Sequence, residues 1–185
     1  ILYKGKPLHF KGASDAIKYN FAYLTEERKV SGIFPRGDLT FNTCISSLGK
    51  YINGFYISDA KMKEATEREI KMMHTRCMGA DDSIMALSGG NQQKVVIAKW
   101  LENDPKILIL NSPTVGVDIG SKADIHACAR KLARQGMGVI IISDDISEIM
   151  QNCSRVLVMK KGRIVSEHKV SQLTEAELSQ QLRED

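Results

Sequence analysis

The sequence predicts an α/β fold with a small helical lobe, and three features point to it. Two short aliphatic runs, residues 107–110 and 139–142, have the composition of buried parallel strands. Each run is followed by polar residues and then by a helical pattern, which is the alternation of an open α/β sheet. Before them, a Leu-Ser-Gly-Gly turn at residues 87–90 leads into a predicted helix over residues 91–101, with the serine suited to cap that helix and the glycines to a close backbone approach. Residues 87–90 are called the glycine turn below.

The part of the chain before the glycine turn mixes strand, loop and helix signals. Three elements are expected before residue 25: a hairpin over residues 1–10, a helix over 15–19 and a strand over 21–24. The pattern between Gly32 and Gly54 indicates loops. A helix is then expected over residues 58–78, with Met62, Ile70, Met73 and Cys77 on one face.

After the glycine turn, strands and helices alternate regularly. The expected elements are a strand over 107–110, a helix over 121–135, a strand over 139–142, a short helix ending near Met150, a hairpin over 156–166 and a last helix opened by the capping box Thr174–Glu177. Parallel strands present their carboxyl ends at one edge of a sheet, where ligands bind. We therefore expect residues 87–90, 111–114 and 143–145 to form one ligand-facing region.

Composition excludes several classes of function. The net charge of +4 comes from 26 basic and 22 acidic residues that are well mixed, so a nucleic-acid partner is not expected. The aliphatic runs are too short to span a membrane. The four cysteines and four histidines show no metal-ligand spacing, so no metal-ligating residues are predicted. No secretory signal is visible, and because the chain opens with Ile1 we expect it to be a piece cut from a longer protein.

The motifs resemble those of a known family. The stretch LSGGNQQK at 87–94 resembles the signature motif of ABC-type ATPases, in the variant common among sugar importers. Residues 115–118 resemble the D-loop, with Asp118 as its acid, and residues 141–145 resemble the switch strand. Residues 155–165 are similar to the hairpin that follows the switch strand in this family. Residues 115–118 are called the D-loop segment below.

One further stretch of sequence indicates which kind of ABC-type ATPase the chain resembles. Residues 23–29 are similar to a segment of the second cassette in tandem sugar-importer ATPases, with Glu26 at the position of the Q-loop glutamine. The chain thus resembles the C-terminal cassette of a ribose, galactose or xylose type subunit, truncated at its N-terminus. This implies a P-loop NTPase-like fold with the start of the core sheet and the Q-loop region in 1–39, a helical subdomain in 40–85, and the signature, Walker B, D-loop and switch regions with the C-terminal hairpin and helix in 86–185.

Departures from the family pattern bear on the mechanism. No P-loop is present, because the nearest match, Gly49-Lys50, has Cys44 at the leading glycine position and Tyr51 at the serine or threonine position. The two Walker B acids are replaced by Asn111 and Ser112, and the switch histidine by Asp144. Loss of a positioned general base costs about 10²–10⁴ in rate, so this cassette is expected to be inactive alone.

The resemblance also implies cofactors and partners. Family members work as paired cassettes, with each ATP held between the P-loop of one cassette and the signature of the other. The implied nucleotide-contacting residues here are Ser88, Gly89, Gly90, Gln92, Glu26 and Asp118. ATP and Mg²⁺ are expected in the complete transporter but not tightly bound to this chain alone. The implied partners are a second cassette (in the same parent chain or a second copy), a membrane permease and, indirectly, an external sugar-binding protein, with this chain peripheral on the cytoplasmic face of the membrane.

Other interpretations remain open at this point. The chain is alternatively a regulatory or scaffold module without nucleotide chemistry, or an ABC protein that acts outside transport. Asn111 and Ser112 are alternatively an ordinary polar strand end. Asp118 is also suited to capping helix 121–135, and Asp144 or Asp145 to capping the short helix that follows.

Overall fold

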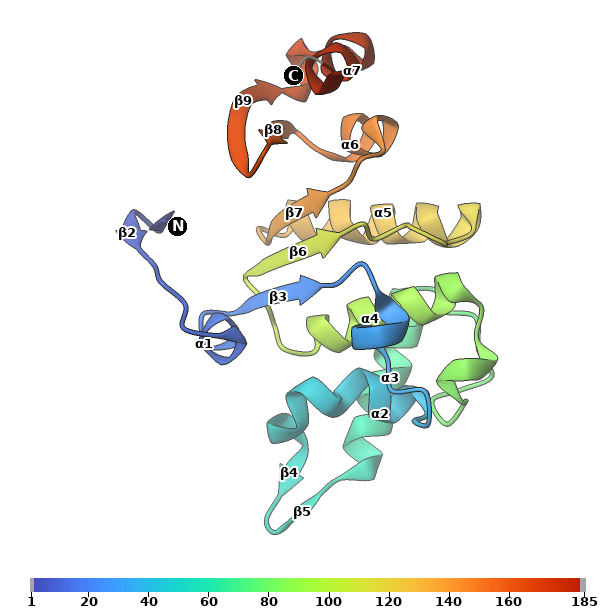
Figure 1. Ribbon diagram of the computed structural model, residues 1–185. Helices are drawn as coiled ribbons and strands as arrows, with labels where there is room; N and C mark the ends of the chain where they lie inside the picture. The colour runs from blue at the N-terminus through green and yellow to red at the C-terminus, as the bar shows by residue number, and fades with distance from the viewer. Residues whose placement is uncertain (1, 184–185) are drawn as a thin grey trace. The chain divides into compact units, whose positions relative to one another are not determined.

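The computed structural model describes residues 2–183 of the chain (Figure 1). The chain divides into two compact units, Ile1–Ile140 and Ile141–Asp185. The first unit contains a parallel sheet and most of the helices, and the second contains a hairpin between two helices. Residue 1 of the expected N-terminal hairpin lies outside the described residues.

The sheet of the first unit confirms the expected α/β core. Strand β3 (Phe21–Leu24) runs parallel to β6 (Ile107–Asn111), with Leu24 opposite Leu110. Strand β7 (Gly138–Ile142) follows β6 in the sheet order β3-β6-β7. Leu24, Leu108 and Leu110 are fully buried. The carboxyl ends of β3 and β6 therefore lie at the same edge of the sheet.

The prediction that β7 is a buried strand is wrong. Ile140 and Ile142 are 50% and 49% exposed, whereas alternate residues of β6 are buried. Among the described strands, β7 is an outer strand of the sheet. An aliphatic run shows that a strand suits a buried sheet, but it does not show which neighbours cover the strand.

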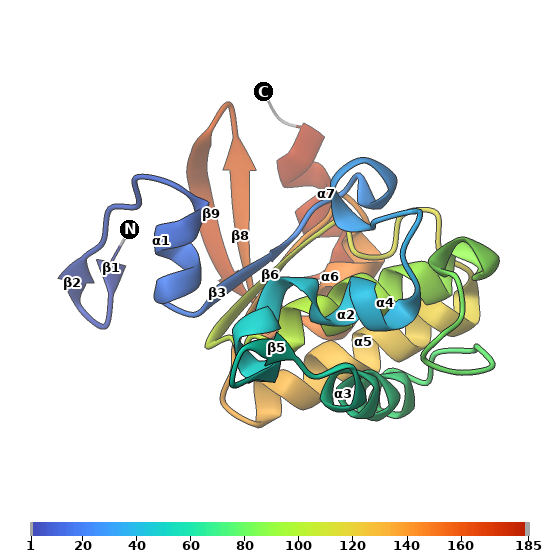
Figure 2. The same ribbon diagram turned by 90° about the horizontal axis from the view of Figure 1, so that it is seen from below.

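Helix α4 (Gly89–Leu101) is the central helix of the first unit. Every residue from Gly90 to Lys99 is buried, including four successive apolar residues from Val95 to Ala98. The helix contacts β3, α2 (Leu39–Cys44), α3 (Asp59–Met72) and α5 (Ile119–Arg134), and it lies between the sheet and the α2–α3 region (Figures 1 and 2). Because α4 is packed on all sides, the glycine turn at its N-terminus is held by the core.

The segment between Gly32 and Gly54 is more ordered than the predicted loops. A π-helical turn, η1 (Arg28–Gly32), precedes it, and α2 is followed by the 3₁₀ helix η2 (Ile45–Tyr51). Asp38 caps α2 by accepting a hydrogen bond from Phe41 N at 2.7 Å. The short hairpin of β4 (Ile52–Asn53) and β5 (Tyr56–Ile57) then leads to α3. These helices are too short for a clear apolar period, which is why the sequence pattern missed them.

Helix α3 ends six residues earlier than predicted. It runs to Met72, and His74 then adopts a left-handed conformation with φ of 50°. The carbonyl of His74 accepts a hydrogen bond from Lys94 Nζ at 3.0 Å, which holds the chain in this turn. Cys77 therefore lies beyond the helix, whereas Met62 and Met73 are buried as expected.

The N-terminal elements differ only slightly from expectation. Strands β1 (Leu2–Tyr3) and β2 (Lys6–Pro7) form the hairpin, so its second strand precedes residues 8–10. Helix α1 (Ala13–Lys18) follows. The ring of Phe10 packs edge-on against Phe21 of β3 with centroids 5.2 Å apart, which places this region beside the start of the sheet.

The second unit has the elements that the sequence predicts. Helix α6 (Ile146–Asn152) precedes strands β8 (Arg155–Lys160) and β9 (Arg163–Lys169), and η4 (Val170–Gln172) leads to α7 (Glu175–Arg183). Val156, Val158 and Leu178 form its core. The capping box is confirmed, since Thr174 Oγ1 accepts from Glu177 N at 3.2 Å and Thr174 N donates to the Glu177 carboxylate at 2.8 Å. Within residues 2–183, no helix is long and apolar enough to cross a membrane.

Candidate functional site

The glycine turn ends in a capped helix N-terminus, as predicted. Ser88 is the N-cap of α4, and its Oγ accepts hydrogen bonds from Asn91 N at 3.4 Å and from Asn91 Nδ2 at 2.9 Å. Ser88 is exposed, and its hydroxyl proton has no acceptor among the residues that the structure describes. A helix N-terminus carries free N–H groups and the positive end of the helix dipole, so this turn suits an anion.

The two glycines are closely packed within the chain, and the fixed atoms of a neighbouring helix exclude a Cβ at Gly90. A Cβ on Gly90 would lie 2.5 Å from Asp118 Oδ2 and 2.5 Å from Ser121 Cβ. A Cβ on Gly89 would lie 2.5 Å from Arg28 Nη2 and 3.1 Å from the Gly116 carbonyl oxygen. The close backbone approach expected at this turn is therefore an approach to the D-loop segment and the start of α5.

Asp118 joins the D-loop segment to α5. It is the N-cap of that helix, and its Oδ1 accepts a hydrogen bond from Ser121 N at 2.9 Å. The backbone hydrogen bond from Ser121 lowers the pKa of the Asp118 carboxyl group. The capping role is confirmed, and it places an exposed carboxylate directly beside the N-terminal turn of α4.

Arg28 is a site residue that the sequence analysis did not single out. Its Nη1 donates to the carbonyl of Val115 at 3.1 Å, and its Nη2 donates to the carbonyl of Gly116 at 3.3 Å. Glu26, two residues earlier, is exposed in the bend that follows β3, and its carbonyl accepts from Arg28 N at 3.0 Å. The available signal was position, because an arginine directly after a parallel strand lies at the ligand-binding edge of the sheet.

The end of β6 carries no acidic side chain. Asn111 Nδ2 donates to the hydroxyl of Tyr23 on β3 at 3.2 Å. Ser112 adopts φ of 48°, and its carbonyl accepts from Val115 N at 3.3 Å, which starts the D-loop segment. Mg²⁺ prefers charged oxygen ligands, and these two side chains are neutral. Across residues 2–183, no group of three acidic, histidine or cysteine side chains is arranged to hold a metal ion.

Gln92 is placed under the glycine turn. Its Nε2 donates to the carbonyls of Ile84 at 3.3 Å and Leu87 at 3.2 Å, and the residue is buried. Its Oε1 is buried without a partner among the described residues. In this structure Gln92 supports the backbone that leads into the turn, and contact with a nucleotide stays a prediction.

Asp144 belongs to the second unit. Asp145, and not Asp144, caps α6, since its Oδ1 accepts from Glu148 N at 3.1 Å. This outcome decides one of the alternatives left open by the sequence. The predicted place of Asp144 next to the residues of the first unit stays a prediction.

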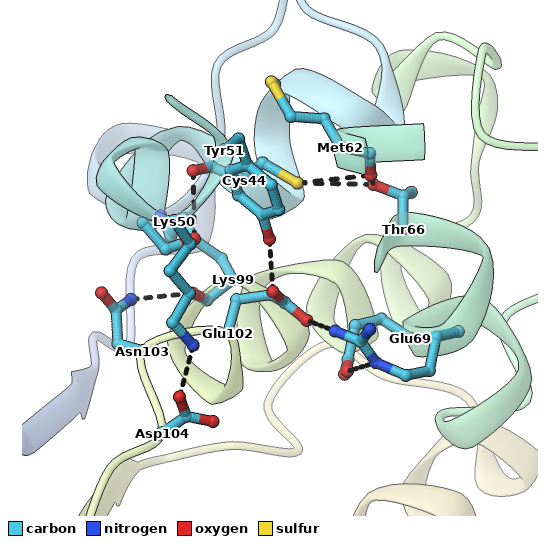
Figure 3. Close-up of polar contacts among 12 residues, drawn as sticks. Cys44, Lys50, Tyr51, Met62, Thr66, Glu69, Lys99, Glu102, Asn103 and Asp104 are labelled. Atoms are coloured by element: carbon cyan, nitrogen blue, oxygen red, sulfur yellow. Dashed lines mark hydrogen bonds and ion pairs between the residues drawn. The ribbon is translucent and has the colours of Figure 1, made fainter. Parts of the chain in front are cut away.

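The opposite end of α4 is anchored by buried charges (Figure 3). Glu102 is 4% exposed and accepts hydrogen bonds from Tyr51 of η2 and from Arg68 of α3. Glu69 lies beside Arg68, and burial, together with the charge of Glu102, raises the pKa of Glu69 to about 7. Lys99 donates to the carbonyl of Gly32, which links α4 to η1. These bonds fix α4 to the elements on either side of it.

Solved structures define the class of fold. The chain is similar to the ATP-binding cassette MJ0796, solved as a dimer in a post-hydrolysis state with ADP and Pi, with a TM-score of 0.74 at 20% identity over 91% of this chain and 72% of that one. It is also similar to cbiO1 from Clostridium perfringens, part of the cbiONQ ABC transporter complex, with a TM-score of 0.74 at 21% identity over 98% of this chain and 71% of that one. The fold is that of an ABC ATPase cassette.

Sequence comparisons show the family. The family model described as ABC transporter matches residues 1–115, and the chain belongs to that family. It is 44% identical over 160 residues to the galactose/methyl galactoside import ATP-binding protein MglA of Treponema pallidum, which covers 86% of this chain and 32% of that protein. It is 40% identical over 177 residues to a putative ribose/galactose/methyl galactoside import ATP-binding protein of Rhizobium etli. This match covers 96% of this chain and 33% of that protein. The chain thus spans about a third of the length of these relatives.

Proposed function

We propose that this chain is a degenerate cassette of a sugar importer's ATP-binding subunit, and that its glycine turn completes the ATP site of a partner cassette. The observation that carries the proposal is a contrast within the first unit. The glycine turn keeps an exposed Ser88 at the N-terminus of a buried helix, and the D-loop segment is packed against it. The neighbouring strand end has Asn111 and Ser112 in place of acids.

The glycine turn has the chemistry to close over a phosphate group. Ser88 and the N–H group of Gly89 would hold the terminal phosphate of an ATP molecule bound by the partner. Phosphoryl transfer is catalysed largely by positioning and by preorganised charge, which fixed N–H donors at a helix terminus supply. Gly90 is buried under Asp118 and Ser121, so its part is to allow the packing that fixes the turn.

The chain's own nucleotide site, at the end of β6, would be non-catalytic. Neither Asn111 nor Ser112 is a base at neutral pH, and neither neutralises a divalent cation. Turnover in the pair would come from the site that the partner's P-loop and this chain's glycine turn form together. The arrangement explains why one motif is retained while the other is lost.

The transported substrate and the remaining partners follow from the relatives. Their printed names describe import of galactose, methyl galactoside and ribose, so the proposed cargo is a sugar of this class. A membrane permease and an external sugar-binding protein would be the other components. This chain would lie peripherally on the cytoplasmic face of the membrane.

The proposal is tested by substituting Ser88 in the full ATP-binding subunit. Ser88→Arg places a bulky cation where the phosphate would approach, and it is expected to abolish ATPase activity. Ser58→Arg is the matched control, because Ser58 caps α3 through the same contact, with its Oγ accepting from Lys61 N at 3.4 Å. Both variants lose one cap, which costs about 0.5–2 kcal/mol. The control should keep most of its activity.

A second substitution tests the non-catalytic strand end. Restoring both acids with Asn111→Asp and Ser112→Glu is expected to change ATPase turnover by less than about twofold, against the 10²–10⁴ that a working base supplies. A severalfold rise in turnover would mean that this chain's own site is used. Unchanged activity in Ser88→Arg would instead favour a regulatory or scaffold module, which the absence of acids at Asn111 and Ser112 also fits.

A further inference from the structure

The guanidinium group of Arg28 fills the space between the D-loop segment and the glycine turn. It donates to two successive carbonyls, Val115 at 3.1 Å and Gly116 at 3.3 Å. On its other side it lies close to Gly89, where an added Cβ would be 2.5 Å from Arg28 Nη2. One side chain therefore lies against two segments that are at least 25 residues apart in the sequence and at least 59 residues away from it.

Arg28 is held tightly by its surroundings. Its two terminal nitrogens are bonded to backbone carbonyls, and its Nε is buried without a partner among the described residues. Gly32, at the end of the same π-helical turn, would have its Cβ 3.2 Å from Arg28 Cβ and 3.4 Å from the side chain of Val96 on α4. The turn that carries Arg28 is thus pressed against the central helix.

The positive charge of Arg28 does not stabilise α4. A cation beside a helix N-terminus is opposed by the helix dipole, by about 0.3–1 kcal/mol at exposed positions. The two carbonyls of the D-loop segment offset this cost through charge-assisted hydrogen bonds. Arg28 therefore links the D-loop segment to the glycine turn and does not act as a helix cap.

From these contacts we propose that Arg28 is a positioning residue that holds the D-loop segment against the glycine turn. Through it, a displacement of residues 25–28 at the end of β3 moves both segments together. The inference rests on the proposed function, because it assigns Arg28 to the alignment of the turn that closes over the partner's ATP. It predicts two separable effects of removing the guanidinium group, one on mobility and one on turnover.

The test compares Arg28→Met and Arg28→Lys with Arg36→Met, which removes an exposed arginine of the same unit. In the nucleotide-free full subunit, hydrogen exchange of peptides covering 88–91 and 113–118 should accelerate in Arg28→Met and stay unchanged in the control. In the ATPase assay, kcat should fall about 10- to 100-fold while KM changes less than about twofold, as misplacement of preorganised groups predicts. Arg28→Lys keeps the charge but cannot bond both carbonyls, so its kcat should lie between those of the parent and Arg28→Met.

Chemical rescue distinguishes a positioning role of the guanidinium group from a purely structural role of the side chain. Ethylguanidinium added to Arg28→Ala should restore part of the lost kcat and slow the exchange of residues 113–118, with no effect on Arg36→Ala. Unchanged exchange in Arg28→Met, or unchanged kcat despite faster exchange, overturns the inference. Ser88→Arg measured in parallel separates the two proposals, because full activity in that variant removes the proposed function while the exchange result still reports on Arg28.

Discussion

Replacing Gly90 with alanine tests the packing that fixes the glycine turn. The added methyl group would lie 2.5 Å from Asp118 Oδ2 and 2.5 Å from Ser121 Cβ. The carboxylate oxygen can move aside, but the Cβ of Ser121 is fixed to the first turn of α5. The N-termini of α4 and α5 must therefore separate, and the capping contact of Asp118 is disturbed with them.

Two opposing effects set the magnitude for Gly90→Ala. Alanine gains up to about 1 kcal/mol over glycine in a helix. Forcing a methyl group into a filled space costs about 1–3 kcal/mol, and disturbing a cap costs about 0.5–2 kcal/mol. We expect a net loss of about 1–2 kcal/mol in the free energy of unfolding. Gly49→Ala is the matched control, because no atom lies within 4 Å of the Cβ that it adds.

The assay is urea unfolding of the 185-residue chain, followed by fluorescence of Trp100, its single tryptophan. Ser121→Gly removes the fixed atom in the clash, so in a double-mutant cycle it should couple to Gly90→Ala by at least about 1 kcal/mol. If Gly90→Ala is as stable as the parent, or if the two substitutions are additive, the glycine is not required by contact with α5 and the reasoning is wrong.

Two predictions concern the buried charges at the other end of α4. Because burial raises the pKa of Glu69 from 4.5 to about 7, the folded chain retains a proton that the unfolded chain loses, so stability should fall as pH rises from 4.5 to about 7 and then level off. Glu69→Gln should flatten this pH dependence. It should also raise the free energy of unfolding, measured in urea at about pH 8, by up to about 3 kcal/mol. Tyr51→Phe removes the donor to Glu102 Oε2, while Arg68 still donates to Oε1, and the unpaired buried oxygen should cost about 1–3 kcal/mol. Tyr56→Phe, at a residue that is 63% exposed, should cost almost nothing in the same measurement, and equal losses would show that the buried bond does not matter.

Local signals in the sequence predicted the features that depend on neighbouring residues. The caps Ser88 and Asp118 and the capping box at Thr174 are each satisfied within three residues, so their residue types are sufficient. The strands at 21–24 and 107–110 were predictable because each is a short, mostly apolar run bounded by turn residues. Parallel pairing then follows from the alternation with helices.

Features that depend on distant residues were not predictable in this way. The exposure of β7 depends on which strands flank it, and the early end of α3 depends on Lys94 binding the His74 carbonyl. The role of Gly90 as a packing residue required the position of α5, and the link made by Arg28 joins residues 87 and 88 positions apart. The sequence predicts which segments form the candidate site, and the contacts between these segments came from the structure.

The most direct measurement is photo-crosslinking of the full subunit with an ATP analogue that carries its photoreactive group on the γ-phosphate. Mass spectrometry of the labelled peptides then shows which segment of this chain meets the terminal phosphate. We expect label on the peptide that contains Ser88 and Gly89, and loss of that label in Ser88→Arg. Label at Asn111 and Ser112, with the glycine turn unlabelled, would contradict it.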